Sequence, residues 1–267
     1  MTVDPIQAEG FALQVERLYA GLISTVDWVP PVSLLRPGIS ANAGARALAS
    51  EIWASEPSLG GKLLYAGELD AEARALLVAA NIAGAASLAA SADAAHGKQA
   101  LRDGVVDFLV ASLDEALRIL KNEIRKRETA AVCVALEPET VEQEMLERGV
   151  APDLMRPGAA DLLDGQLLLC WCVASSPAIW LPKLDAIAGA HLGSEDGTAR
   201  RWLRLAPRYL GRMAQGVRVL RCSESTAANF RERMREKVES GVIGVRVELR
   251  LSSEGQSEQY SFAPSTY

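Results

Sequence analysis

Two histidines are the first candidates for acid–base chemistry in this sequence. His96 lies in Ala95-His96-Gly97-Lys98, where a loop or a helix start is expected, and His191 lies in a predicted loop between helices. Neither has a carboxylate close to it in the sequence, so both are interpreted as exposed loop histidines rather than general bases. No strand-to-helix turn of the G-x-S-x-G type occurs, which argues against a serine-based catalytic triad.

Four cysteines could supply a nucleophile or metal ligands: Cys133, Cys170, Cys172 and Cys222. Their surroundings are apolar or mixed, and their spacing is not that of paired zinc ligands. They are therefore interpreted as reduced, cytosolic thiols, and no metal site is predicted.

Arginines gather in residues 198–215, a stretch with helical character. If Pro207 does not disrupt the helix, Arg201, Arg204, Arg208 and Arg212 share one face. Such a row could hold an anionic ligand or an acidic partner. The alternative is a solvated face balanced by nearby acids, which is common on protein surfaces.

The elements that would position these side chains alternate regularly in the middle of the chain. Short apolar runs separated by amphipathic stretches require crossover connections, and hence a mostly parallel sheet covered by helices on both faces. The predicted strands are 62–66, 85–90, 105–110, 130–135 and 153–155, and the predicted helices are 71–83, 97–103, 113–126 and 138–148. The alanine-rich stretch 79–95 is interpreted as close packing of a helix against this sheet.

The flanking segments are less regular and predict a smaller α/β domain. Asp4 followed by Pro5 is typical of a helix start, and Trp28-Val-Pro30-Pro31 should end that helix. Further expected elements are a helix at 41–54, strands at 166–174, 217–221 and 242–251, and a helix at 223–240. The tail from Ser252 is expected to be a frayed end.

Composition limits the classes of partner. The 267 residues carry a net charge of −6 with a pI near 5.2, so no basic face is expected, and nucleic acid and anionic membranes are poor partners. The chain start lacks a secretion signal, and the longest apolar run is too short to span a bilayer. The sequence therefore predicts a soluble, cytoplasmic protein that binds a small molecule or a protein partner, and a homodimer is an open alternative.

Several sequence blocks, taken in order, resemble the NAD-binding domain of urocanase. These blocks are Ser58-Leu-Gly-Gly61-Lys62-Leu-Leu-Tyr-Ala66-Gly67, Ala83-Gly84-Ala-Ala-Ser87-Leu88, Leu113-Asp-Glu-Ala-Leu117 and Arg148-Gly-Val-Ala-Pro152-Asp153. The resemblance implies a Rossmann-like domain over residues 58–155. Fainter similarity around Cys172 and Arg201 implies a discontinuous core-like domain formed by residues 1–57 and 156–267, as in a shortened urocanase.

The resemblance implies a cofactor site, but the predicted phosphate turn departs from the family pattern. Rossmann turns use glycines because a backbone without Cβ lets N–H groups approach the diphosphate. Here Gly67 is the remaining glycine, and Glu68, Asp70 and Glu72 follow it. These carboxylates should repel NAD, or else simply cap a helix. No cofactor is therefore expected in the family's pose, although NAD is implied by the resemblance.

The remaining site residues are predicted from the same resemblance. Ser91 takes the place of the acid that would hold the ribose, with Asp93 nearby, so Gly67, Ser91 and Asp93 are the candidate cofactor residues. Cys172 matches a functionally important family cysteine, but Val173 replaces the arginine that follows it. Cys172 is thus either catalytic or a buried thiol.

Two functions follow from this reasoning. The first is a urocanase-like binding or interaction module without NAD or urocanase activity, tied to histidine breakdown. The alternative is a reduced hydratase acting on urocanate or a similar small molecule, with Cys172 as its best catalytic residue. A structural subunit completed by a second chain is a third reading.

Overall fold

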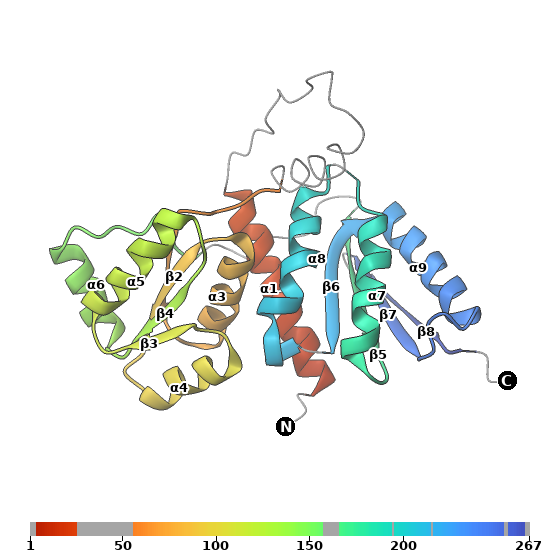
Figure 1. Ribbon diagram of the computed structural model, residues 1–267, viewed down its shortest axis with the longest axis horizontal. Helices are drawn as coiled ribbons and strands as arrows, with labels where there is room; N and C mark the ends of the chain where they lie inside the picture. The colour runs from red at the N-terminus through yellow and green to blue at the C-terminus, as the bar shows by residue number, and fades with distance from the viewer. Residues whose placement is uncertain are drawn as a thin grey trace, which may run out of the picture.

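The computed structural model describes residues 4–25, 56–156, 166–193, 195–214, 216–253 and 256–264. Within these ranges two four-stranded sheets lie side by side along the long axis of the molecule, with helices α1 and α8 between them (Figure 1). The mixed α/β class predicted from the sequence is confirmed. The helix predicted at 41–54 and the predicted stop at 28–31 lie outside the described residues.

The first sheet is wholly parallel. Its strands are β1 (Leu63–Glu68), β2 (Ala86–Ala90), β3 (Phe108–Val110) and β4 (Ala131–Val134), in the order β1-β2-β4-β3. An isolated parallel bridge between Leu64 and Leu154 extends it beyond β1. Each strand was predicted, although β3 is shorter than expected, and residues 153–155 form this bridge rather than a full strand.

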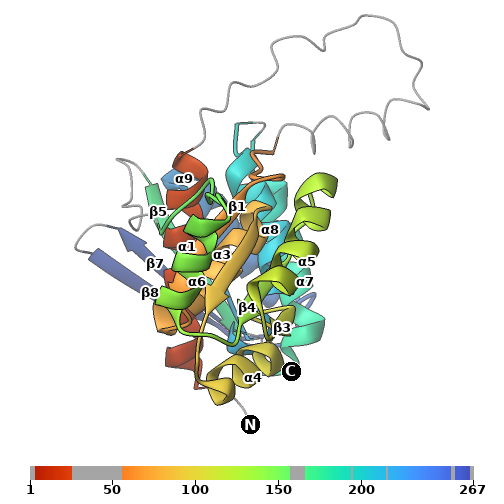
Figure 2. The same cartoon turned by 90° about the vertical axis from the view of Figure 1, so that its left-hand side faces the viewer.

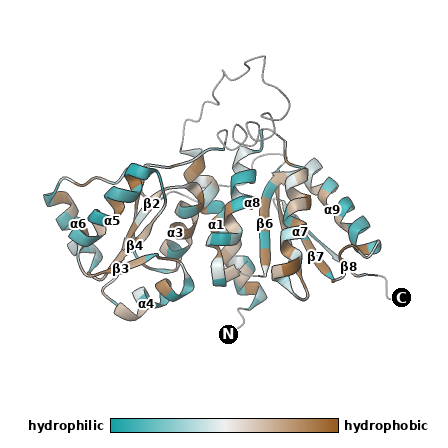
Figure 3. Cartoon of the chain, in the orientation of Figure 1, coloured by the Kyte–Doolittle hydropathy of each residue, from teal (hydrophilic) through white to brown (hydrophobic). Residues whose placement is uncertain are grey.

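Helices cover both faces of this sheet, as the strand-helix alternation requires. Helices α3 (Ala71–Ala83) and α4 (Ala94–Asp103) share a core with one face, and α5 (Leu113–Lys126) and α6 (Pro138–Glu147) with the other. Figure 2 faces this unit, and Figure 3 shows the hydrophilic outer side of α5. The predicted close packing at the alanine-rich stretch is confirmed, since Ala79, Ala83 and Ala89 are fully buried.

The second sheet is antiparallel. Its strands are β5 (Gln166–Val173), β6 (Val217–Ser223), β7 (Val247–Ser253) and β8 (Gln256–Phe262), in the order β6-β5-β7-β8. Helices α7 (Pro177–Ala190) and α9 (Glu224–Glu239) pack against one face. The ring of Trp171 on β5 lies 5.0 Å from that of Phe230 on α9, which anchors this core.

Three details of the second sheet differ from the sequence predictions. The prediction of a frayed tail from Ser252 is wrong, because residues 256–262 pair with β7 along its whole length. The strand expected from 242 begins at Val247. Helix α7, which precedes His191, was not predicted as an element.

Helices α1 (Pro5–Ser24) and α8 (Gly197–Tyr209) connect the two sheets. Helix α1 begins as predicted, with the Asp4 carboxylate accepting the Ile6 N–H, and it packs against both α3 and β6. Helix α8 runs through Pro207 to Tyr209, and a 3₁₀ turn, η1 (Gly211–Ala214), follows. One hydrophobic core is continuous from α3 through α1 to β5 and β6, and the division into residues 58–155 and a discontinuous domain stays a prediction.

No helix in the described part of the chain combines the length and the apolar character needed to cross a membrane.

Candidate functional site

The turn between β1 and α3 is closed by its own side chains. Gly67 has a φ of +75°, and the strand then ends at Glu68. The buried Leu69 donates its N–H to the Ala90 carbonyl at 2.9 Å, which ties the turn to β2. Asp70 is the N-cap of α3, and its Oδ1 accepts the Ala73 N–H at 2.7 Å. One of the N–H groups at the start of α3 is therefore already occupied.

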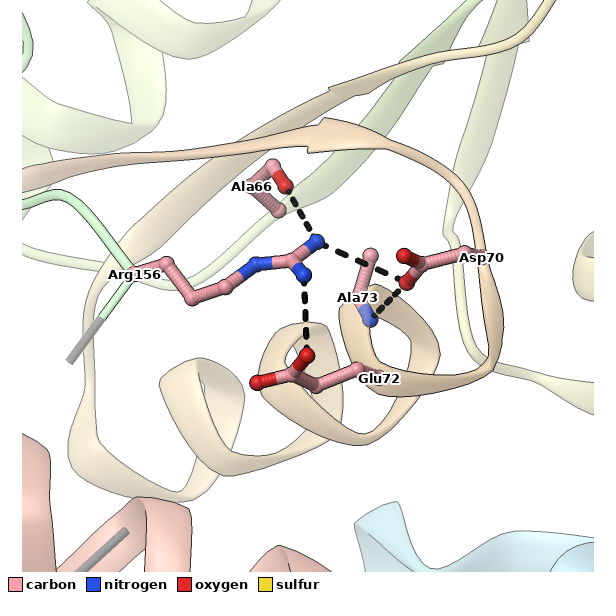
Figure 4. A network of polar contacts seen from close by, with 5 residues as sticks. All are labelled: Ala66, Asp70, Glu72, Ala73 and Arg156. Atoms are coloured by element: carbon pink, nitrogen blue, oxygen red, sulfur yellow. Dashed lines mark hydrogen bonds and ion pairs between the residues drawn. The ribbon is translucent and has the colours of Figure 1, made fainter. Parts of the chain in front are cut away.

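Arg156 contacts this turn, although it lies more than 80 residues further along the chain (Figure 4). Its guanidinium donates to the Ala66 carbonyl at 3.0 Å and to Glu72 Oε2 at 2.9 Å, and it lies 3.5 Å from Asp70 Oδ1. One cation thus balances two of the three carboxylates of the turn. The sequence analysis did not identify Arg156, because its partners are more than 80 residues away and no local motif marks it.

The other predicted cofactor residues lie at the same end of the sheet. Helices α3 and α4 follow β1 and β2 on one face, whereas α5 and α6 follow β3 and β4 on the other, so the topological switch falls between β2 and β4. Open parallel sheets bind ligands outside the carboxyl ends of strands at this switch. Ser91 follows β2 there, and its buried Oγ has no hydrogen-bond partner among the described residues.

Asp93 is used as a helix cap. Its Oδ1 accepts the N–H groups of Ala95 at 2.7 Å and of His96 at 3.4 Å, and the Ala95 bond is the main cause of the lowered pKa of this exposed carboxyl. Asp93 Oδ2 also lies 3.8 Å from His96 Nε2. The interpretation that His96 lacks a nearby carboxylate is therefore wrong, since one helical turn brings the two side chains together at the surface.

Residues 46–161 match a family model described as the urocanase Rossmann-like domain. This segment is therefore similar to the urocanase Rossmann-like domain, and we call it the urocanase-type domain. The match includes the β1–α3 turn, Ser91, Asp93 and Arg156, and it confirms the resemblance inferred from the sequence blocks. In the described part of the chain, no three His, Cys, Asp or Glu side chains gather into a set that could hold a metal ion.

NAD, which the urocanase family associates with this domain, does not fit the β1–α3 turn as it stands. A diphosphate needs free N–H groups and net positive potential at the helix start. Here Asp70 occupies the Ala73 N–H, and Arg156 is held by Ala66 and Glu72. The turn is thus complete without a phosphate ligand.

Cys172 lies in β5 of the second sheet, away from the turn of the urocanase-type domain. It is half-buried, pairs across the strands with Val217 and Glu248, and has a raised pKa. Burial is the largest cause of the shift, and the carboxylates of Glu248 and Glu9 add to it. Since the thiolate is the nucleophile, this environment disfavours reactivity at neutral pH.

We expect Cys172 to react with iodoacetamide at pH 7.5 at least tenfold more slowly than free cysteine, because its thiol stays protonated. Alkylation at each cysteine is followed by peptide mass spectrometry. Glu248→Gln removes one carboxylate that raises the pKa and should accelerate the reaction. If Cys172 instead reacts as fast as free cysteine, it becomes a candidate nucleophile again.

The arginines predicted to share one face of α8 do not form an open basic surface. Most of them contact other groups of the protein. Arg201 donates from Nε to the Ile82 carbonyl at 2.7 Å, and burial lowers its pKa. Arg204 pairs with the buried Glu56, and Arg208 lies over the Tyr209 ring at 5.2 Å. Arg212 lies in η1, beyond the helix. Arg201 therefore joins α8 to α3 of the urocanase-type domain, and Arg204 joins α8 to Glu56, which precedes β1 in the chain.

Proposed function

We propose that the protein is a urocanase-family binding module that does not hold NAD in the family's pose. The observation that supports this most directly is the Arg156 guanidinium on the β1–α3 turn, together with the Asp70 cap. The Asp70 cap occupies a helix N–H that a diphosphate would need, and the donor groups of Arg156 are already directed to Ala66 and Glu72. The ligand of such a module is a small molecule or a protein partner.

The two carboxylates of the turn allow an estimate of how much they weaken NAD binding. Asp70 and Glu72 are each about half exposed, so water screens them. At about 4 Å in a high-dielectric setting, each like-charge contact with a phosphate costs about 1 kcal/mol. Two such contacts weaken binding by roughly 30-fold, since about 1.4 kcal/mol corresponds to tenfold. The occupied Ala73 N–H adds to this loss.

Isothermal titration of the full chain with NAD tests the proposal. We expect no stoichiometric binding at micromolar concentrations by the natural sequence. Asp70→Asn with Glu72→Gln frees Arg156 to meet a phosphate and should tighten NAD binding at least tenfold. Asp114→Asn with Glu115→Gln is the matched control, because it removes two acids from the first turn of α5.

Two outcomes would contradict the proposal. Stoichiometric NAD on the purified natural chain would show that the turn accepts the cofactor. An equal gain in the α5 control would show that net charge, rather than the turn, governs binding.

The family link to histidine breakdown makes urocanate the first small molecule to examine. We expect the full chain, with NAD added, to leave the absorbance of urocanate unchanged. Steady consumption of urocanate would favour the reduced-hydratase alternative, and its loss in Cys172→Ser would then assign that residue to the reaction.

A further inference from the structure

Strand β8 is the open edge of the second sheet. In the order β6-β5-β7-β8, the other edge strand, β6, packs against α1 and α8. Strand β8 pairs with β7 on one side, and no strand in the described part of the chain pairs with its other side (Figure 1). An edge strand presents a row of unpaired N–H and C=O groups, which is a template for pairing with another strand.

The usual protections of an edge strand are missing from β8. Its pairing with β7 runs through seven residue pairs without a bulge. The strand contains no proline and no lysine, and Pro264 follows only after its last residue. Glu258 is its one charged residue. Proteins keep an edge unpaired with charges, prolines or bulges, so the free side of β8 is suited to pairing.

Side chains hold β8 in place on the sheet. The Arg231 guanidinium of α9 donates to the Tyr260 hydroxyl at 2.6 Å and lies 4.9 Å from the centre of its ring. On the other face of the sheet, Ser261 Oγ donates to Glu248 Oε1 at 2.8 Å. The rings of Tyr260 and Phe262 stack with their centroids 6.3 Å apart. Because the strand is already ordered, pairing with it costs little conformational entropy.

The sequence of β8 is compatible with pairing to a second copy of itself. A two-fold axis normal to the sheet sets two copies of the strand antiparallel and pairs residues that share a face. An axis through Gln259, the middle residue, is the choice that pairs the whole strand, and it sets Glu258 opposite Tyr260. An axis one residue earlier sets Glu258 opposite Glu258 instead. Like charges directly opposite each other are destabilising, so the axis through Gln259 is favoured.

We propose that two copies of this chain associate through β8, with the axis at Gln259, and form one continuous sheet. The outward N–H and C=O groups of each copy then bond those of the other. The pair of Glu258 with Tyr260 is chemically matched, because within one strand the Tyr260 hydroxyl already donates to the Glu258 carboxylate. This interface lies in the second sheet and is independent of the proposed function of the urocanase-type domain.

Sedimentation velocity of the full chain at about 100 μM measures this association, which follows mass action. We expect the natural chain to sediment as a dimer. Gln259→Glu and Gln259→Arg each set two like charges opposite each other, and each should weaken self-association at least about fivefold. An equimolar mixture of the two variants sets unlike charges opposite each other and should regain the dimer. A monomeric natural chain at this concentration would overturn the proposal.

Two controls locate the interface and its register. Gln143→Glu on the exposed side of α6 adds the same charge at the opposite end of the molecule and should leave the dimer unchanged (Figure 1). Ser257→Glu adds it on the same face of β8, where Ser261 of the second copy lies opposite, and should weaken the dimer less than Gln259→Glu does. Circular dichroism checks that each variant folds, and if one Gln259 variant does not fold, the other decides. A Gln259→Glu chain as dimeric as the natural chain refutes the proposal.

Discussion

Replacing Arg218 with methionine is expected to lower the free energy of unfolding by about 3 kcal/mol, because it leaves a buried carboxylate without its cation. Arg218 Nε lies 3.0 Å from Asp185 Oδ2, and the two side chains are 11% and 14% exposed. The pair joins α7 to β6. Urea denaturation at pH 7, followed by circular dichroism, measures the loss.

The loss should depend on pH in a defined direction. Burial is the largest cause of the raised pKa of Asp185, and Arg218 partly opposes it. A folded-state pKa above the unfolded value gives stability that is present at low pH and lost as the pH rises through the folded pKa. Removing Arg218 raises that pKa further. The difference between Arg218→Met and the natural chain should therefore shrink as the pH falls from 7 towards 4.

Two further variants test whether the loss of stability arises because the Asp185–Arg218 ion pair is buried. Asp185→Leu with Arg218→Met removes both charges and should recover most of the loss, since it leaves no buried ion. Arg233→Met breaks an exposed pair with Glu236, 2.7 Å apart, and should cost less than about 1 kcal/mol. Equal losses in Arg218→Met and Arg233→Met would contradict this account.

Local signals predicted the parallel unit well because each helix carries its own boundaries. The predicted bounds of α3 and α5 agree with the structure, and both helices begin at a side-chain cap, Asp70 or Ser112. The caps satisfy backbone N–H groups that no other part of the helix can bond. Such signals lie within a few residues of the boundary, so the sequence suffices.

The second sheet was harder to predict from the sequence, because its elements depend on partners that are distant in the chain. Strand β8 has mostly exposed, polar residues, and its register is supplied by seven pairs with β7. Helix α7 is apolar on most sides and contains Pro182, so the usual amphipathic pattern is missing. Neither pairing partners nor a neighbouring helix can be read from such a segment alone.

The candidate site shows the same division between local and distant information. The acids of the turn were predicted to cap a helix or repel phosphate, and the Asp70 cap is confirmed. The closure by Arg156 was not foreseen, because only the fold brings residue 156 to residue 66. Likewise, the contact between the rings of Tyr19 and Trp202 joins segments about 180 residues apart in the chain. It forms only when α1 and α8 pack together.

Gly84→Ala is expected to destabilise the urocanase-type domain by about 3 kcal/mol, although it adds a single methyl group. Gly84 ends α3 with a φ of +98°, a conformation that costs an L-residue roughly 1–2 kcal/mol. A Cβ there would lie 2.6 Å from Ser58 Oγ and 2.7 Å from an Arg201 guanidinium nitrogen. The methyl group would therefore disturb the contact between Arg201 and the Ile82 carbonyl, which joins α8 to α3.

Gly104→Ala provides a matched control for backbone strain. Gly104 ends α4 in the same left-handed manner, with a φ of +75°, but no atom lies within 4 Å of the Cβ position. It should cost only about 1 kcal/mol, measured by urea denaturation alongside Gly84→Ala. Adding Ser58→Ala to Gly84→Ala should recover part of the excess loss. Equal losses at the two glycines would mean that backbone strain alone explains the loss at Gly84, and that Ser58 and Arg201 move away from the methyl group without measurable cost.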